Sequence, residues 1–199
     1  MSMKKFLPKI LIPVLCTLPL SLPAQDGKVQ LSDQSKLSIK GKSNVNEFRC
    51  QAEHDLHRDS LSYYYQVEED TVTVNGVSLS LEISQFDCGK RAINRDFRST
   101  LKYKEYPFIE IILNELRLKD ESDIIPSDAL VTIRIAGQER HYTVPLNTFS
   151  SSEDQYIVGG NKVLYMTDFG LTPPTPMFGL IKVDDELDIE FELIIQREE

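Results

Sequence analysis

Histidine and carboxylate side chains gather in one short stretch of the sequence. His54 and His57 are three residues apart, beside Glu53, Asp55 and Asp59. Two histidines and a third strong ligand can bind zinc, but residues three apart converge only in a helix or a turn, because in a strand they face opposite sides. No third strong ligand is evident, so we interpret this stretch as a solvated polar loop rather than a metal site.

The residue patterns of hydrolases and of phosphate-binding loops do not occur in the sequence. There is no Gly-x-Ser-x-Gly motif, and serines collect in loops such as Ser150-Ser151-Ser152. The adjacent carboxylates Asp184-Asp185-Glu186 are expected at a solvated turn, and His141 is expected at the surface. The sequence therefore predicts a protein that is not an enzyme and that holds no metal.

The N-terminus has the features of a secretory signal peptide. Two lysines precede a short apolar run, Phe6 to Leu22, which prolines interrupt and which reaches a small residue at Ala24. Lipid attachment at Cys16 is an alternative, but Leu15 stands where that modification needs a small residue, and an uncleaved anchor is a second alternative. We expect residues 1–24 to be the signal peptide, residues 25–199 to form a single domain, and the protein to be periplasmic or secreted.

The expected mature chain is strongly acidic. Removing residues 1–24 leaves 175 residues and lowers the formal charge from −9 to −12, because three lysines are lost. Nucleic acids and anionic membranes attract cationic surfaces, and no basic cluster is evident in the mature sequence. We therefore expect no nucleic-acid partner, no stable membrane insertion after signal removal, and a monomer or homodimer.

Cys50 and Cys88 are the cysteines that remain after cleavage. In an oxidising compartment a disulfide bond between them is expected, and the alternative is two buried thiols that act as small hydrophobic side chains. A bond enclosing this loop stabilises the fold by roughly 3–4 kcal/mol in the chain-entropy model. Their separation does not fit the paired spacing of redox or zinc motifs.

Strand patterns dominate the rest of the chain. The run from Leu187 to Leu193 alternates apolar and acidic residues, and shorter apolar runs recur with turn residues between them, including Asn75-Gly76, a hairpin signal after residues 71–74. Ile93, Phe97 and Leu101 are four apart, which predicts one short helix. The pattern predicts an all-β antiparallel fold, a sandwich or a barrel. The strict alternation with acidic outer positions fits a closed barrel of about eight strands with a short helix near one mouth.

Apolar side chains are concentrated around this helix and around the Pro-rich loop at residues 172–179. For each one, packing of the barrel end is the simpler interpretation, but as a set they also describe the lining of a hydrophobic pocket. The candidate lining residues are Phe97, Leu101, Tyr106, Phe108, Phe169, Leu171, Met177 and Phe178. Arg95 and Arg98 are the nearest basic groups for a polar or anionic head, with surface ion pairing as the alternative.

Several segments, in order, resemble the YceI-like, lipid-binding family. They are residues 35–41 as the opening strand, 94–109 as the helix followed by Tyr106-Pro107, 131–137 with 142–146, the Asp168-Phe169-Gly170-Leu171 run, and the last strand from Asp185. The resemblance covers roughly residues 35–193. Residues 51–74, with three successive tyrosines, and the enlarged loop at Pro173-Pro174-Thr175-Pro176 depart from the family pattern.

The resemblance implies a lipocalin-like barrel that holds an isoprenoid or quinone-like lipid without transforming it. An apolar chain in water costs about 0.8 kcal/mol per exposed methylene, so an apolar tube shields it effectively. The alternative function is a barrel filled by its own side chains that serves as a structural or protein-interaction module of the cell envelope. A bound lipid is the one cofactor-like molecule that the sequence suggests.

Overall fold

The computed structural model describes residues 25–52, 61–68, 70–120 and 123–198. Its strands are β1 (Gln25–Leu31), β2 (Lys36–Ser43), β3 (Glu47–Ala52), β4 (Leu61–Glu68), β5 (Thr71–Asn75), β6 (Ser78–Glu82), β7 (Phe86–Asp87), β8 (Phe108–Asp120), β9 (Asp123–Ile135), β10 (Gln138–Ser151), β11 (Gln155–Tyr165) and β12 (Val183–Glu198). Its helical elements are η1 (Ile83–Gln85), α1 (Arg91–Thr100) and η2 (Met166–Phe169). None of the helices in these ranges has the length and apolar character needed to span a membrane.

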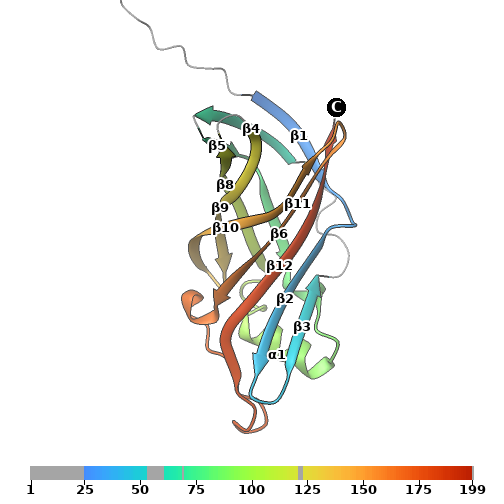
Figure 1. Cartoon of the computed structure of the whole chain (residues 1–199). Helices are drawn as coiled ribbons and strands as arrows, with labels where there is room; N and C mark the ends of the chain where they lie inside the picture. The colour runs from blue at the N-terminus through green and yellow to red at the C-terminus, as the bar shows by residue number, and fades with distance from the viewer. Residues whose placement is uncertain (1–24, 53–60, 69, 121–122, 199) are drawn as a thin grey trace, which may run out of the picture.

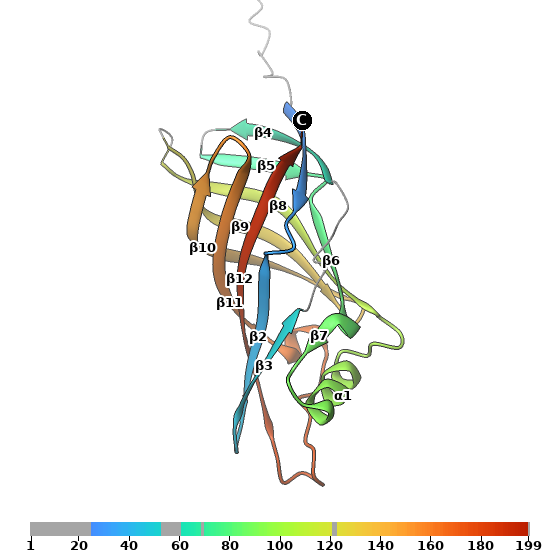
Figure 2. The same cartoon turned by 90° about the vertical axis from the view of Figure 1, so that its right-hand side faces the viewer.

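Eight of the described strands close into an antiparallel ring (Figures 1 and 2), in the order β1-β4-β5-β8-β9-β10-β11-β12. The first and last strands complete it: Lys28 pairs with Glu198, and Leu31 pairs with Ile195. Closure satisfies the backbone groups that an open sheet would leave at its edges. The all-β, eight-stranded barrel with one short helix that the sequence predicted is confirmed.

Two pairs of consecutive strands lie end to end along a longer strand. β1 and β2 both pair with β12, and β5 and β6 both pair with β8. The hairpin predicted at Asn75-Gly76 is therefore wrong, since β5 pairs with β4 and β8 rather than with β6. Gly76 does have a positive φ, but its role is close approach: a Cβ there would lie 2.4 Å from the carbonyl oxygen of Ser62.

Strand alternation places one face of the sheet toward the inside of the ring. In β9, Val131, Ile133 and Ile135 are buried, whereas Arg134 between them is exposed. Residues paired across neighbouring strands share a face, so the register carries this inner face around the ring. Beyond β12 the sheet continues through β2, β3 and β7.

Helix α1 packs at one end of the molecule, away from the C-terminus (Figure 2). Its apolar face holds Ile93 and Phe97, and the ring of Phe97 lies 5.4 Å from that of Phe86, which is buried. Leu101, directly after the helix, is also buried. The helix predicted from this spacing is thus present, and its apolar face helps to fill this end of the core.

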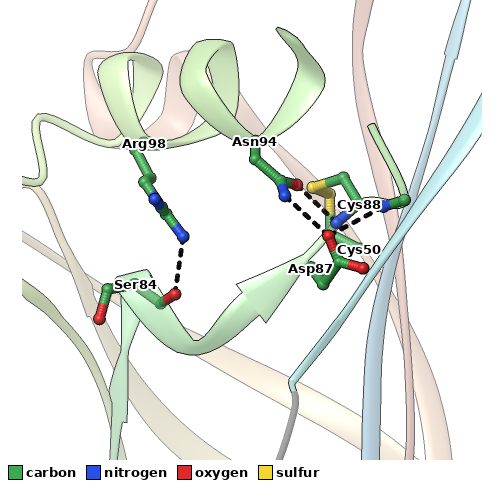
Figure 3. The surroundings of a disulfide bond; sticks show 7 residues. Cys50, Ser84, Asp87, Cys88, Asn94 and Arg98 are labelled. Carbon is green, nitrogen blue, oxygen red and sulfur yellow. Dashed lines mark hydrogen bonds between the residues drawn. A yellow bond between two sulfur atoms is a disulfide. The ribbon is translucent and has the colours of Figure 1, made fainter. Parts of the chain in front are cut away.

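A disulfide bond between Cys50 and Cys88 joins β3 to the segment before α1 (Figure 3), as the sequence predicted. Asn94 of α1 reinforces the junction: its Oδ1 accepts from the backbone N–H of Cys88 at 2.6 Å, and its Nδ2 donates to Asp87 Oδ1 at 2.7 Å. The hydrogen bond from Asn94 is the main reason that the pKa of Asp87 lies below its usual value. The helix is therefore tied to the sheet by covalent and polar bonds as well as by packing.

Candidate ligand-binding site

A belt of apolar side chains lines the middle of the ring. Ile111 pairs with Ile133, Leu113 with Val131, and Leu146 with Gly160, so all face inward. Inward members that are only partly buried include Leu31, Ile111, Leu113, Leu116, Leu146, Ile189 and Phe191. These side chains pack against the core but keep some exposure, whereas the residues nearer α1 are buried, so the middle of the ring is less completely packed than that end.

Three inward aromatic rings lie against glycines of a neighbouring strand. Tyr63 lies over Gly27 and Phe48 over Gly41, each directly across the strand pair. The third pair, Phe191 with Gly160, has the same arrangement. An aromatic ring can lie flat on the sheet only where its neighbour has no Cβ. These pairs keep Tyr63 and Phe191 against the wall of the ring, and they keep Phe48 against the part of the sheet that continues beyond β12.

Polar side chains enter the ring on β10 and β11. The hydroxyl of Tyr142 donates to Asp168 Oδ2 at 2.9 Å, and the Nζ atom of Lys162 lies 5.6 Å from the centre of the Tyr142 ring. Burial, together with this hydrogen bond to a carboxylate, raises the pKa of Tyr142 to about 12. Tyr142 thus remains a neutral hydrogen-bond donor at physiological pH.

The end of the ring near the C-terminus is lined by aromatic residues and an arginine. Tyr63 stacks on Tyr65 with ring centres 6.0 Å apart, and Phe149 stacks on Tyr156 at 6.2 Å. The guanidinium of Arg197 lies 4.3 Å from the centre of Tyr156. Burial is the main cause that raises the pKa of Tyr63. The sequence analysis missed these residues, although Tyr63 and Tyr65 alternate with Tyr64 as one face of a strand does.

Four of the predicted lining residues lie in the packed core near α1. Phe169 is 2% exposed, and Leu101 and Leu171 are also buried. Phe97 is partly buried against this core, and the ring of Phe169 lies 6.1 Å from that of Tyr142. The structure therefore brings these four together in the packed core beside α1, where they fill volume. Their direct contact with a ligand stays a prediction.

The other apolar members of the predicted set lie outside this core. Phe108 and Met177 are exposed, Phe178 is fully exposed, and Tyr106 covers Gly137 at the turn between β9 and β10. The signal that singled them out, large apolar residues near turns, does not distinguish the inner surface of a barrel from its outer tips. Their contact with a ligand held inside the ring stays a prediction.

The predicted basic residues lie on α1. Arg95 is paired with Asp96 at 3.3 Å, whereas Arg98 donates to the carbonyl oxygen of Ser84 at 2.8 Å (Figure 3). They border a surface hollow of about 1000 Å³ along α1 and the following turn, whose charged lining residues are Arg91, Arg95, Arg98, Lys102, Lys104 and Glu105.

The expectation that the mature sequence lacks a basic cluster is wrong. Residues 90–104 carry six cationic side chains and one carboxylate, that of Asp96. The net negative charge of the whole chain concealed this segment. Its cationic side chains lie on or beside a single helix and the turn that follows it. The His54 and His57 pair lies outside the described residues, and within the described ranges no group of three or more His, Cys, Asp or Glu residues could hold a metal.

Solved structures share this architecture. Burkholderia cenocepacia BcnA has a TM-score of 0.59 at 17% identity, covering 83% of this chain and 99% of that one. A polyisoprenoid-binding domain from Saccharophagus degradans, implicated in plant cell wall breakdown, has a TM-score of 0.56 at 12% identity, covering 85% and 98%. A Campylobacter jejuni YceI protein has a TM-score of 0.48 at 14% identity, covering 71% and 83%.

No protein-family model matches the sequence, and no curated protein matches it either. The chain nevertheless shares its fold with BcnA and with the polyisoprenoid-binding domain, and this fold is the antiparallel barrel that the resemblance of its segments predicted. At these identities the likeness concerns the fold.

Proposed function

We propose that this protein binds a long apolar lipid, such as an isoprenoid or a quinone-like chain, inside its ring and carries it without chemical change. The observation that supports this most directly is the inward belt of partly accessible leucine, isoleucine and phenylalanine side chains. A filled core would bury them, whereas a binding space leaves them available to an apolar ligand.

The comparisons support the same function. The similar domain from Saccharophagus degradans is a polyisoprenoid-binding domain, and its fold corresponds to 85% of this chain. The rings of Tyr63 and Phe191, held against glycines on the wall of the barrel, support this proposal, because they place bulk away from the centre where a ligand would lie. The apolar side chains of the inner face are suited to shielding an apolar chain from water rather than to catalysing a reaction.

We also propose that residues 1–24 are removed during export and that the mature protein acts in the periplasm or outside the cell. The disulfide between Cys50 and Cys88 supports this location, because such bonds persist in oxidising compartments. N-terminal sequencing of the protein from its own cell envelope tests this proposal, and a mature chain that begins elsewhere would refute it.

The test of lipid binding is native mass spectrometry of the purified protein, followed by organic extraction. A discrete added mass that extracts as an isoprenoid or quinone-like lipid is the expected result. In a second step, returning the lipid to extracted protein should raise its melting temperature, because a ligand that binds only the folded state stabilises it. An unliganded mass with no thermal shift would instead favour the filled barrel that acts as an interaction module.

A further inference from the structure

Strand β11 has a charged residue, Lys162, at an inward position where a barrel strand usually has an apolar one. Lys162 pairs with Ile189 of β12, which pairs with the buried Ile39 of β2, so the three residues share the inner face. Its neighbour Val163 faces outward and is exposed. A charged residue at an inward position between apolar ones opposes folding, and such departures from the pattern are expected at functional sites.

The ammonium group of Lys162 has no carboxylate partner among the residues that the structure describes. Its described contact is the face of the Tyr142 ring, at 5.6 Å. Asp168, the acid bound to Tyr142, accepts the tyrosine hydroxyl instead. A partly buried cation held this way retains hydrogen-bond donors for another group inside the ring.

We propose that Lys162 binds the anionic head of the lipid, a phosphate or carboxylate attached to an apolar chain. This rests on the proposed function, because the chain of such a ligand would lie along the apolar belt. From Lys162 the inner face continues through Gly160 and Phe191 to Leu193 and Ile195, which are apolar positions toward the other end of the ring. The polar head would thus lie near the packed α1 end, and the chain would extend toward the aromatic end.

The test compares two probes with the same chain, farnesyl phosphate and farnesol, by isothermal titration calorimetry. A hydrogen bond to a charged group is worth enough to favour farnesyl phosphate by at least about tenfold in the wild-type protein. The Lys162→Met variant should lose this preference but still bind farnesol, and Lys162→Arg should keep most of it. Lys36→Met, at an exposed lysine of β2, is the matched control and should behave as wild type.

A second readout separates binding from folding. Without ligand, Lys162→Met should melt at the same or a higher temperature than wild type, because it removes an unpaired inward charge. Equal probe ratios in wild type and Lys162→Met, or a melting temperature that falls in the variant, would overturn the assignment of Lys162. If neither probe binds the wild type, the proposed lipid-binding function fails instead.

An independent observation concerns the tip of the molecule next to α1. Val45, Met177, Phe178 and Leu180 are all exposed, and Phe178 has a relative exposure of 108%. Asn44 holds the two contributing loops together: its Nδ2 donates to the carbonyl oxygen of Leu180 at 3.0 Å, and its Oδ1 accepts from the backbone N–H of Lys182 at 2.8 Å. We call these four apolar residues the apolar tip.

The backbone of the apolar tip is strained in a way that exposes Phe178. Met177 and Phe178 have φ values of 58° and 56°, in the left-handed region that residues other than glycine rarely adopt, and Gly179 follows at 86°. Such strain persists where function needs the resulting geometry. Here it holds a phenylalanine outside the core, where it has no packing role.

Positive charge lies at the same end of the molecule. Figures 1 and 2 both show α1 and the loop before β12 at the end opposite the C-terminus, and the six cations of residues 90–104 are carried by α1 and its flanking residues. An anionic bilayer has acyl chains below a layer of phosphate groups. The exposed apolar residues at this end fit the acyl chains, and the basic surface at the same end fits the phosphate groups. We infer that this end of the protein docks on an anionic lipid bilayer, with the apolar tip inserted.

Vesicle flotation tests the docking. Wild-type protein should float with vesicles of phosphatidylglycerol and phosphatidylcholine, less with phosphatidylcholine alone, and less at high salt. The double variant Phe178→Ser/Leu180→Ser should lose most of the binding, about tenfold or more, whereas Tyr64→Ser, an exposed aromatic residue of β4, serves as the matched control.

Three outcomes would overturn this docking. They are absence of wild-type flotation, equal flotation of the double variant, and a change from dimer to monomer in that variant, which would show that a second copy covers the tip. The measurement does not depend on lipid inside the ring, so it is independent of the assignment of Lys162.

Discussion

The packing of Phe48 on Gly41 can be tested with the Gly41→Ala change, whose effect on stability should change sign when Phe48 is removed. A Cβ atom at Gly41 would lie 2.3 Å from Phe48 Cζ, and the two next contacts, at 2.8 and 2.9 Å, are also atoms of that ring. The Gly41→Ala change must therefore push the ring off the wall of the sheet. Forcing additional volume into a packed site costs roughly 1–3 kcal/mol of unfolding free energy.

The same change should stabilise the protein once the ring is absent. In a Phe48→Ala background the three atoms nearest to the new Cβ are absent, and the backbone at Gly41 has no positive φ. Replacing glycine by alanine then reduces the entropy of the unfolded chain, which stabilises by about 0.4–1 kcal/mol. The effect of Gly41→Ala should thus change from destabilising to neutral or stabilising.

Urea denaturation of the four proteins, with the disulfide intact, measures this cycle. The coupling between the two positions should be about 1.5–4 kcal/mol, the sum of the two ranges above. A cost of Gly41→Ala that is the same in both backgrounds would refute the idea that the glycine exists to receive the ring.

Three further predictions follow from the core and its polar groups. Replacing Cys50 and Cys88 by serine should lower the unfolding free energy by about 4 kcal/mol, measured by urea denaturation, and a reductant should then no longer affect stability. The pKa of Tyr142 is raised from 10 to about 12, so its contribution to stability is complete below pH 10 and is lost as the pH rises through 12. A difference titration by ultraviolet absorbance, wild type against Tyr142→Phe, should show this raised pKa. The Asp168→Asn variant should lower the pKa of Tyr142. Phe169→Ala should cost about 3–5 kcal/mol in thermal unfolding, since the ring is 2% exposed; a loss of less than 1 kcal/mol would show that Phe169 borders open space instead.

The fold was predictable because its main signals are local. The alternation from Leu187 to Leu193 and the spacing of Ile93, Phe97 and Leu101 each depend on one element, and both elements are present. Asn75-Gly76 gave a wrong hairpin, because the same dipeptide serves a tight turn and a close approach between strands. Which role applies depends on pairing with β4, and this is a contact that the local sequence does not contain.

The candidate site was harder to predict because it depends on register. Lys162 looks like a surface residue until its pairing with Ile189 places it on the inner face. The glycines at positions 27, 41 and 160 look like weak points of strands until the ring opposite each is known. Conversely, Met177 and Phe178 are apolar and near a mouth, yet a left-handed backbone turns them outward. In each case a partner distant in sequence decides the direction of the side chain.

The position of β12 has a consequence for how the chain is made. This last strand pairs with β1, β2 and β11, so both N-terminal strands have no closing partner until residues 183–198 have been synthesised. Contacts of such large sequence separation form late and slowly. A chain leaving the ribosome therefore cannot close its barrel before residues 183–198 emerge. That delay would suit the export that we propose, because a chain whose barrel is still open can pass through a narrow channel.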